Sequence, residues 1–229
     1  MACLLSHSFT LLHLHSVTRI HRNFAHMSIL AVLDPEQQGA DRDARIISAL
    51  ERLSEVVRNR AWDTGQELGL SPLHVQVLAF IATHHPHMRR ASALANEFHL
   101  SKPTVSVALR KLEEDGYVKQ VASKADARAK ELHLTAKGTR AGQVAAGHLN
   151  ALLPPLTALS HADRDDLYTL LFQLLAGAQR SGLVKVDRMC PTCLHYEGRK
   201  SGAYCKLLRK PLKTHELRVD CPEHEVVHV

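Results

Sequence analysis

Four cysteines near the carboxyl end of the chain have the residue type and spacing of a metal site. Two residues separate Cys190 from Cys193; Cys205 follows after eleven more and Cys221 after another fifteen. The close pair allows two thiolates to turn toward one ion, and four thiolates satisfy either tetrahedral zinc or an iron–sulfur cluster. The sequence therefore predicts a metal centre on these four cysteines.

The spacing favours iron and sulfur over zinc. Zinc ribbons commonly use two close pairs of cysteines, whereas this tail has one pair and two single cysteines. The tail also resembles the small cluster-binding domains of the high-potential iron protein type. That resemblance rests on Tyr196 three residues after the pair, Tyr204 before the third cysteine, and Pro222 after the fourth. Structural zinc is the alternative, and we expect His195 and His224 to be solvated.

The distribution of charge along the chain indicates what class of molecule the region before this tail binds. The formal net charge is +6, and residues 71–150 hold 11 Lys or Arg against 6 Asp or Glu. Such a concentration of positive charge favours a polyanion, either nucleic acid or an anionic membrane surface. Because no apolar run approaches the roughly 18 to 20 residues of a membrane span, we expect no membrane insertion.

The spacing of apolar residues predicts a protein built mainly of helices. Apolar side chains recur at three- and four-residue steps from Asp41 to Leu68, where Gly69 can end a long amphipathic helix. Ser71-Pro72 and Ser101-Lys102-Pro103 are helix start signals, since serine caps free amides and proline is tolerated in the first turn. The expected helices cover residues 41–68, 71–83, 92–98, 101–116, 135–153 and 160–175, with an interruption at Pro154 and Pro155.

Two of these helices and the segment after them form a recognisable DNA-binding pattern. The helix over 92–98 is joined by a two-residue turn to the helix over 101–116, which opens with polar and basic residues. Such a pair is typical of a helix-turn-helix. Residues 117–121 and 131–134 then alternate apolar and polar positions, which predicts a β-hairpin with a basic tip over 122–130.

This order of elements resembles the MarR family of bacterial repressors over residues 41–180. The shared motifs are Leu94-Ala95, Ser101 to Ser106, Leu112 to Val118, Asp126-Ala127-Arg128 and Leu132 to Gly138. The resemblance implies a homodimer formed by the outer helices, with a recognition helix in each major groove of a palindromic operator in double-stranded DNA. It also implies a hairpin wing near the minor groove. Here Ala125 and Ala127 flank Asp126, so this wing is poorer in arginine than the family pattern.

The residue types of the second helix and the wing suggest specific DNA contacts. Hydroxyl and ammonium groups at the start of the helix can donate to phosphates and base edges, and its free amides add partial positive charge. At the wing, an arginine oriented by a carboxylate can enter a narrow minor groove while lysines meet phosphates. The predicted contacts are Ser101, Lys102, Thr104, Ser106, Arg110, Lys124, Asp126, Arg128 and Lys130.

The fold class expected is mainly α with a small β-wing. It comprises a winged helix-turn-helix flanked by dimerisation helices, and a small cysteine-rich module at the carboxyl end. We expect three parts: an N-terminal extension over 1–40, without fixed structure or preceding a true start at Met27; the winged-helix domain over 41–182; and the metal-binding tail over 183–229. A regulator of this kind works in the reducing cytoplasm, which disfavours disulfides between the cysteines.

The function expected is a transcriptional repressor whose operator binding depends on the four-cysteine centre, as a sensor of redox state, oxygen or iron. The alternative is a repressor released by a small aromatic ligand, with structural zinc in the tail. We expect no enzyme, since the sequence has no phosphate-binding glycine loop, nucleophile elbow or paired metal-binding histidines. His84, His85 and His87 are expected to form a solvated connection.

Overall fold

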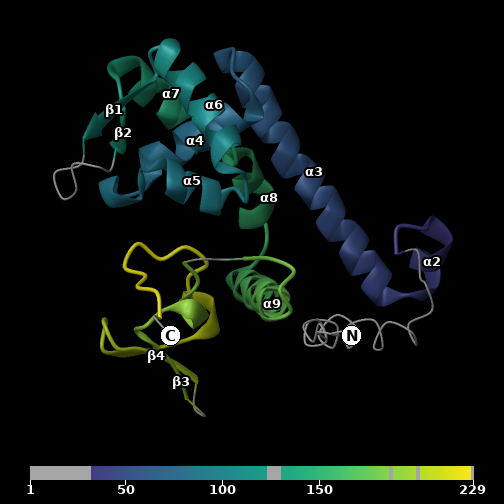
Figure 1. Ribbon diagram of the computed structural model, residues 1–229. Coiled ribbons are helices and arrows are strands. Elements are labelled where there is room, and N and C mark those ends of the chain that lie inside the picture. The colour runs from purple at the N-terminus through teal and green to yellow at the C-terminus, as the bar shows by residue number, and fades with distance from the viewer. Residues whose placement is uncertain (1–31, 123–129, 186–187, 200–201, 228–229) are drawn as a thin grey trace, which may run out of the picture. The chain divides into compact units, whose positions relative to one another are not determined.

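The computed structural model describes residues 32–122, 130–185, 188–199 and 202–227 (Figure 1). The chain divides into two compact units, residues 1–56 and residues 57–229. Within the described residues, no helix combines the length and the apolar character that a membrane crossing requires. The three-part division expected from the sequence stays a prediction.

The first unit contains a short helix and the beginning of a long one. Helix α2 (Pro35–Ala40) starts where the Asp34 carboxylate accepts a hydrogen bond from the Glu36 N–H, at 3.0 Å. Its last carbonyls accept from the Arg45 guanidinium, at 2.8 Å for Gln38 and 3.2 Å for Gly39. Arg45 belongs to α3 (Arg42–Leu68), the long helix that the apolar pattern predicted. The end of the expected N-terminal extension is therefore helical.

Four helices of the second unit pack around one hydrophobic core (Figure 1). They are α4 (Pro72–Thr83), α5 (Ala91–Glu97), α6 (Lys102–Glu114) and α7 (Ala136–Ala146). The Ser71 hydroxyl accepts from the His74 N–H at the start of α4, so the predicted serine cap is confirmed. The largest fully buried side chains of this core are Val75, Val77, Leu78, Ile81, Leu94, Val105, Leu112 and Leu132.

The predicted hairpin is also present. Strand β1 (Val118–Ala122) pairs antiparallel with β2 (Lys130–Leu134), with Val118 opposite Leu134 and Ala122 opposite Lys130. The buried side chains of these strands are Val118 and Leu132, so the hairpin is anchored at its base. The tip, residues 123–129, lies outside the described residues.

The last helices differ from expectation around two prolines. Helix α7 ends at Ala146, and a 3-10 turn (Asn150–Leu152) leads into α8 (Leu153–Thr157). Pro154 and Pro155 lie in the first turn of α8, where a missing N–H costs little, so the expected interruption there is wrong. Helix α9 (His161–Arg180) begins as predicted, since the Ser160 hydroxyl accepts from the Asp163 N–H at 3.1 Å.

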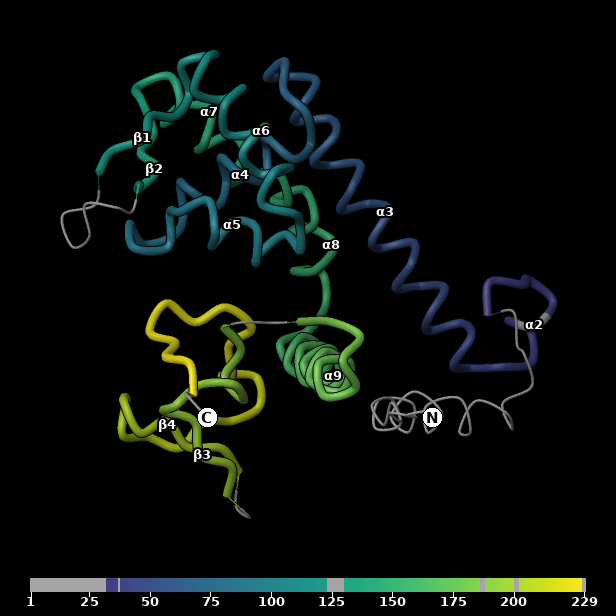
Figure 2. Tube along the Cα trace, in the orientation of Figure 1, coloured from purple at the N-terminus to yellow at the C-terminus, as the bar shows by residue number. Residues whose placement is uncertain are grey.

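The cysteine-rich tail forms a small sheet that the sequence analysis did not predict. A 3-10 turn (Cys190–Thr192) precedes β3 (Tyr196–Arg199), β4 (Gly202–Cys205) and β5 (Lys210–Leu212). The strands are antiparallel in the order β3-β4-β5, and Figure 2 shows β3 and β4 side by side. Met189 and Leu217 of the tail are buried together with Phe172 and Ala176 of α9. The tail thus completes its core on α9.

We predict that Gly138→Ala destabilises the winged-helix core. A Cβ at this position of α7 would lie 1.8 Å from the Tyr117 carbonyl oxygen, which also accepts from the Thr135 N–H at 3.0 Å. Relieving this overlap must shift α7 from the base of the wing, at a cost of about 1 to 3 kcal/mol. Urea unfolding followed by circular dichroism measures the change.

The matched control is Gly177→Ala in α9, where the nearest atom to the added Cβ is Arg180 Nη2 at 3.8 Å. This variant is expected to equal or exceed the wild-type stability, by up to about 1 kcal/mol, because alanine favours the helix. Equal stability of the Gly138→Ala variant and the wild type would show that the close approach of α7 to Tyr117 does not constrain the fold.

Candidate functional site

Helix α6 presents a polar and basic surface to solvent. Its buried stripe consists of Val105, Ala108, Leu109 and Leu112, which pack into the core of the second unit. The opposite surface carries the predicted contact residues Lys102, Thr104, Ser106 and Arg110, all of them exposed. Ser101 caps the helix: its hydroxyl accepts from the Thr104 N–H at 3.2 Å and lies 2.8 Å from the Thr104 hydroxyl. The structure therefore brings five of the nine predicted DNA contacts onto one helix.

A tight turn fixes α6 relative to α5. The Leu100 N–H donates to the Ala95 carbonyl at 3.0 Å, and His99 adopts a left-handed conformation with φ of 51°. Phe98 packs against the core and meets the Phe80 ring edge-on at 6.0 Å. The end of α5 therefore determines where α6 begins.

An apolar residue on the exposed surface of α6 was missed by the sequence analysis. Val107 is 64% exposed, between the exposed Ser106 and the buried Ala108. A valine on a surface that is otherwise polar can contact a thymine methyl group, which base-edge hydrogen bonding cannot read. Its place outside the buried stripe was the signal that could have identified it.

The wing is held against both α6 and the segment before α5. The Gln120 side-chain amide donates to the Glu113 carboxylate of α6 at 2.9 Å, and the Leu132 N–H donates to the Arg89 carbonyl at 2.7 Å. Lys130 is exposed at the start of β2, as a phosphate contact requires. Lys124, Asp126 and Arg128 lie outside the described residues, so their DNA contacts remain predictions.

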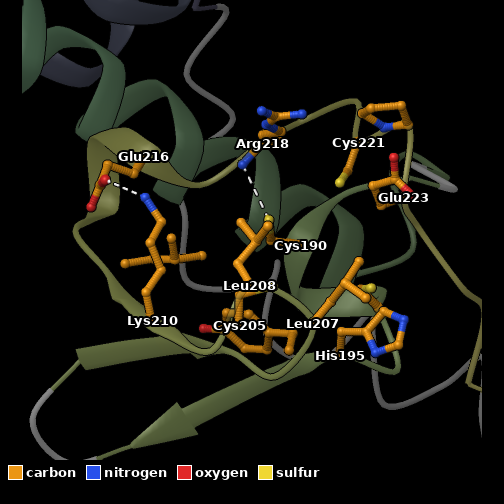
Figure 3. Close-up of a pocket in the computed structure, with 14 residues that line it drawn as sticks. Cys190, His195, Cys205, Leu207, Leu208, Lys210, Glu216, Arg218, Cys221 and Glu223 are labelled. Atoms are coloured by element: carbon orange, nitrogen blue, oxygen red, sulfur yellow. Dashed lines mark hydrogen bonds and ion pairs between the residues drawn. The ribbon is translucent and has the colours of Figure 1, made fainter.

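The four tail cysteines line one cavity of about 310 Å³ (Figure 3). Cys190 comes from the 3-10 turn, Cys205 from the end of β4, and Cys221 from the loop that follows Asp220. The Arg218 N–H donates to Cys190 Sγ at 3.2 Å, the contact dashed in Figure 3. His195 and Leu207 are among the other residues of the wall. The four cysteines therefore line the same cavity, and the metal site on them stays a prediction.

The four thiols lie near enough to affect the pKa of Cys190, but they do not converge on a single position. Among the described residues, no three His, Cys, Asp or Glu side chains gather closely enough to hold one metal ion. Burial raises the pKa of the Cys190 thiol, the Arg218 N–H acts against this, and the three other cysteines raise the pKa further. Four thiolates at this site would repel one another unless a cationic group lay between them.

Both tail histidines are partly buried, contrary to the expectation that they are solvated. His195 lines the cavity, and its Nε2 lies 3.3 Å from the Glu225 carboxylate. His224 Nε2 lies 2.9 Å from the Thr192 hydroxyl. Backbone pairing of residues 193–194 with residues 225–226 brings these groups together.

A partly buried arginine connects the tail to the helix-turn-helix. The Arg188 side chain is 12% exposed, and its guanidinium binds two carboxylates, Glu97 at 2.7 Å and Asp220 at 2.6 Å. Burial acts to lower the pKa of Arg188, but the two carboxylates outweigh this effect and raise it. The hydrogen bond with His84 holds the pKa of Asp220 far below its usual range; burial opposes this shift and Arg188 adds to it.

The expectation that His84 is solvated is wrong. Its side chain is 20% exposed, its ring stacks on Phe80 with centroids 3.7 Å apart, and its Nε2 lies 2.9 Å from the Asp220 carboxylate. His85 and His87 are exposed, with their Nδ1 atoms 2.7 Å apart. Sequence reasoning missed this network, because no local pattern links two residues that are 136 positions apart.

Comparison with known proteins identifies the winged-helix part of the chain. Residues 68–129 match the MarR family. No curated relative matches the sequence. In fold, the chain is similar to MepR of Staphylococcus aureus in its DNA-binding conformation, with a TM-score of 0.52 and 18% identity over 58% of this chain and 98% of MepR. The helices α5 and α6 and the hairpin therefore belong to a part of the chain whose fold is similar to that of MepR.

Two further solved structures resemble the same region. One is the MepR–DNA complex of Staphylococcus aureus, with a TM-score of 0.49 and 19% identity over 58% of this chain and 96% of that one. The other is the transcriptional regulator Tm0710 from Thermotoga maritima, with a TM-score of 0.42 and 21% identity over 62% of this chain and 99% of that one.

We predict that Ser101→Ala destabilises the protein by about 1 kcal/mol, because the Thr104 N–H loses its cap. Ser101→Asn should keep stability near the wild-type value, since asparagine caps as well as serine does. Thermal and urea unfolding of both variants measure this difference. If alanine and asparagine at this position gave the same stability, the hydroxyl would not be needed as a cap.

Proposed function

We propose that this protein is a DNA-binding transcriptional regulator that reads its operator with α6. The observation that carries the proposal is the exposed polar and basic surface of α6, held by the turn after α5 and flanked by the β1–β2 wing. The match of residues 68–129 to the MarR family supports it, as does the shared fold with MepR in a DNA-binding conformation.

The chemistry of α6 suits contact with a major groove. Lys102 and Arg110 are exposed and have positive charges for phosphates or for guanine acceptors. Ser106 lies one turn before Arg110 on the same surface and can donate to or accept from a base edge. Val107 adds an apolar contact for thymine. The helix therefore presents groups for both phosphate attachment and sequence discrimination.

Exposed leucines on α9 support the proposed homodimer. Leu167, Leu170, Leu171 and Leu174 are exposed in the single chain, with Leu170 at 64%. A row of large apolar side chains on one helix is unfavourable in water, and a second copy of the chain would remove it from solvent. Two copies would present two α6 helices to a palindromic operator.

We also propose that Cys190, Cys193, Cys205 and Cys221 hold an iron–sulfur cluster. The four thiols line one cavity, and their sequence spacing, with one close pair and two single cysteines, favours the cluster over a single zinc ion. The backbone hydrogen bond to Cys190 Sγ is of the kind that stabilises thiolates at such centres.

The proposed consequence is control of operator binding by that centre. A tail with so small a core depends on its metal for much of its folding free energy. Oxidation or loss of the cluster would therefore destabilise the folded tail. The protein would then be a repressor whose DNA binding responds to redox state, oxygen or iron. The alternative is that the tail holds a structural zinc and that a small aromatic ligand releases the repressor from DNA. Metal analysis distinguishes this alternative from the iron–sulfur cluster.

We predict that Arg110→Gln weakens DNA binding by about tenfold. Loss of one phosphate contact should also lower the slope of log affinity against log salt concentration by about 0.9. The measurement is fluorescence anisotropy with a duplex that the wild-type protein enriches from a random pool, across a series of salt concentrations.

The control is Arg199→Gln, which removes the same charge from β3, where Arg199 pairs with Glu197 at 2.8 Å. It should leave both affinity and salt slope unchanged. Equal effects of the two substitutions would mean that Arg110 acts only through the net charge of the protein. The proposal that α6 reads the operator would then be wrong.

We predict that protein purified without oxygen is coloured and contains iron and acid-labile sulfide. Serine in place of each of the four cysteines should abolish the visible absorption, whereas Cys3→Ser should retain it. Elemental analysis and absorption spectra provide the measurement. A colourless protein with one zinc per chain would contradict the iron–sulfur cluster and support the structural zinc.

A further inference from the structure

The tail contacts the helix-turn-helix through the residues next to two of its cysteines. Arg188 precedes Cys190 by two positions and pairs with Glu97, the last residue of α5. Asp220 directly precedes Cys221, accepts from the Arg188 Nε at 2.6 Å, and lies 2.9 Å from His84 after the end of α4. Two short segments of the tail therefore meet the carboxyl ends of α4 and α5.

The same two segments are bound to each other around the cavity. The Cys221 N–H donates to the Arg188 carbonyl at 3.1 Å, and the Cys190 N–H donates to the Arg218 carbonyl at 3.0 Å. Together with the bond from the Arg218 N–H to Cys190 Sγ, these contacts make residues 188–190 and 218–221 one backbone unit. A shift of the Cys190 or Cys221 thiol would therefore move the Arg188 and Asp220 backbone.

Arg188 is suited to transmit such a shift. Its planar guanidinium presents several donors in fixed directions, so it can bind two carboxylates at once. Because its side chain is only 12% exposed, few water molecules can replace a lost carboxylate partner, and loss of the pairing with Glu97 is unfavourable. When the 188–190 segment moves, Glu97 must either follow it or lose its pairing.

Only three residues separate Glu97 from the Ser101 cap of α6, so a displacement of Glu97 affects the start of α6. Phe98, His99 and Leu100 are the three residues between Glu97 and the Ser101 cap. Leu100 is tied back to Ala95 at 3.0 Å, and His99 is held in a left-handed conformation, so this turn has little freedom to absorb motion. The position of the α5 end is thus passed to the start of the reading helix.

We propose that Arg188 is the positioning residue that couples the four-cysteine centre to α6. With the thiolates held on a metal centre, residues 188–190 and 218–221 are fixed and Arg188 holds Glu97. Without the centre the segments relax, the pairing with Glu97 is lost, and α6 changes position. This inference rests on the proposed function, and it places the coupling within one subunit, at the end of α5.

The test compares the DNA affinity of two forms of the full-length protein. One form is isolated without oxygen or reconstituted with ferrous iron and sulfide, with zinc in a parallel arm, and the other is stripped by a chelator under reducing conditions. Duplexes enriched from a random pool by either form serve as probes. The ratio of the two dissociation constants measures the coupling, and for the wild type we expect about 5- to 150-fold.

Arg188→Gln and Glu97→Gln should each bring this ratio close to 1 while iron content and visible absorption are retained. The double variant should lower it no further, because both substitutions break the same pairing. Arg199→Gln, whose pairing with Glu197 stays within the tail, should keep the wild-type ratio. A purely structural role would lower the affinity of both forms equally and leave the ratio unchanged.

The outcomes separate this coupling from the function on which it rests. A wild-type ratio near 1 would overturn control by the cysteine centre, and the coupling with it. A large wild-type ratio that survives in both variants would overturn the role of Arg188 and leave that control standing. If Arg188→Gln fails to fold or to retain iron, the ratio measured for Glu97→Gln alone decides whether the pairing carries the coupling, because Glu97 lies outside the tail.

Discussion

The tail cannot bury a core of its own, and much of the structure follows from this constraint. Its buried side chains, Met189 and Leu217, are completed by Phe172 and Ala176 of α9. Tyr168 of the same helix donates to the Leu217 carbonyl at 2.5 Å, which fixes the loop before Cys221. A segment of this size needs support from a neighbouring helix, and a metal centre would provide the rest.

Because the tail is built on the rest of the second unit, the segments that carry its cysteines also carry its contacts. The Arg188 side chain is only 12% exposed, and a guanidinium that is largely removed from water is stabilised by anionic partners. The pairing with Glu97 and Asp220 provides those partners and at the same time ties the cysteine cavity to the end of α5. The proposed sensor and the proposed reading helix are thereby neighbours within one chain.

The parts of the fold that follow local rules were predictable. Ser71, Ser101 and Ser160 cap their helices as the sequence indicated, because a cap depends on a hydroxyl and on the amides two or three residues later. Pro154 and Pro155 were misinterpreted because proline can end one helix or open the next, and α7 had already ended. The strands of the tail were missed because segments of three or four residues show no clear alternation.

The sequence by itself determined the basic surface of α6, the wing, and the set of four cysteines, since residue type and near spacing are sufficient for each. Only the tertiary structure decided that the cysteines line one cavity and that Arg188 meets Glu97. His84 and Asp220 are 136 positions apart, and no local pattern encodes a partner at that distance. Such a pairing exists because the folded backbone brings the His84 ring, which stacks on Phe80, within hydrogen-bond distance of the Asp220 carboxylate.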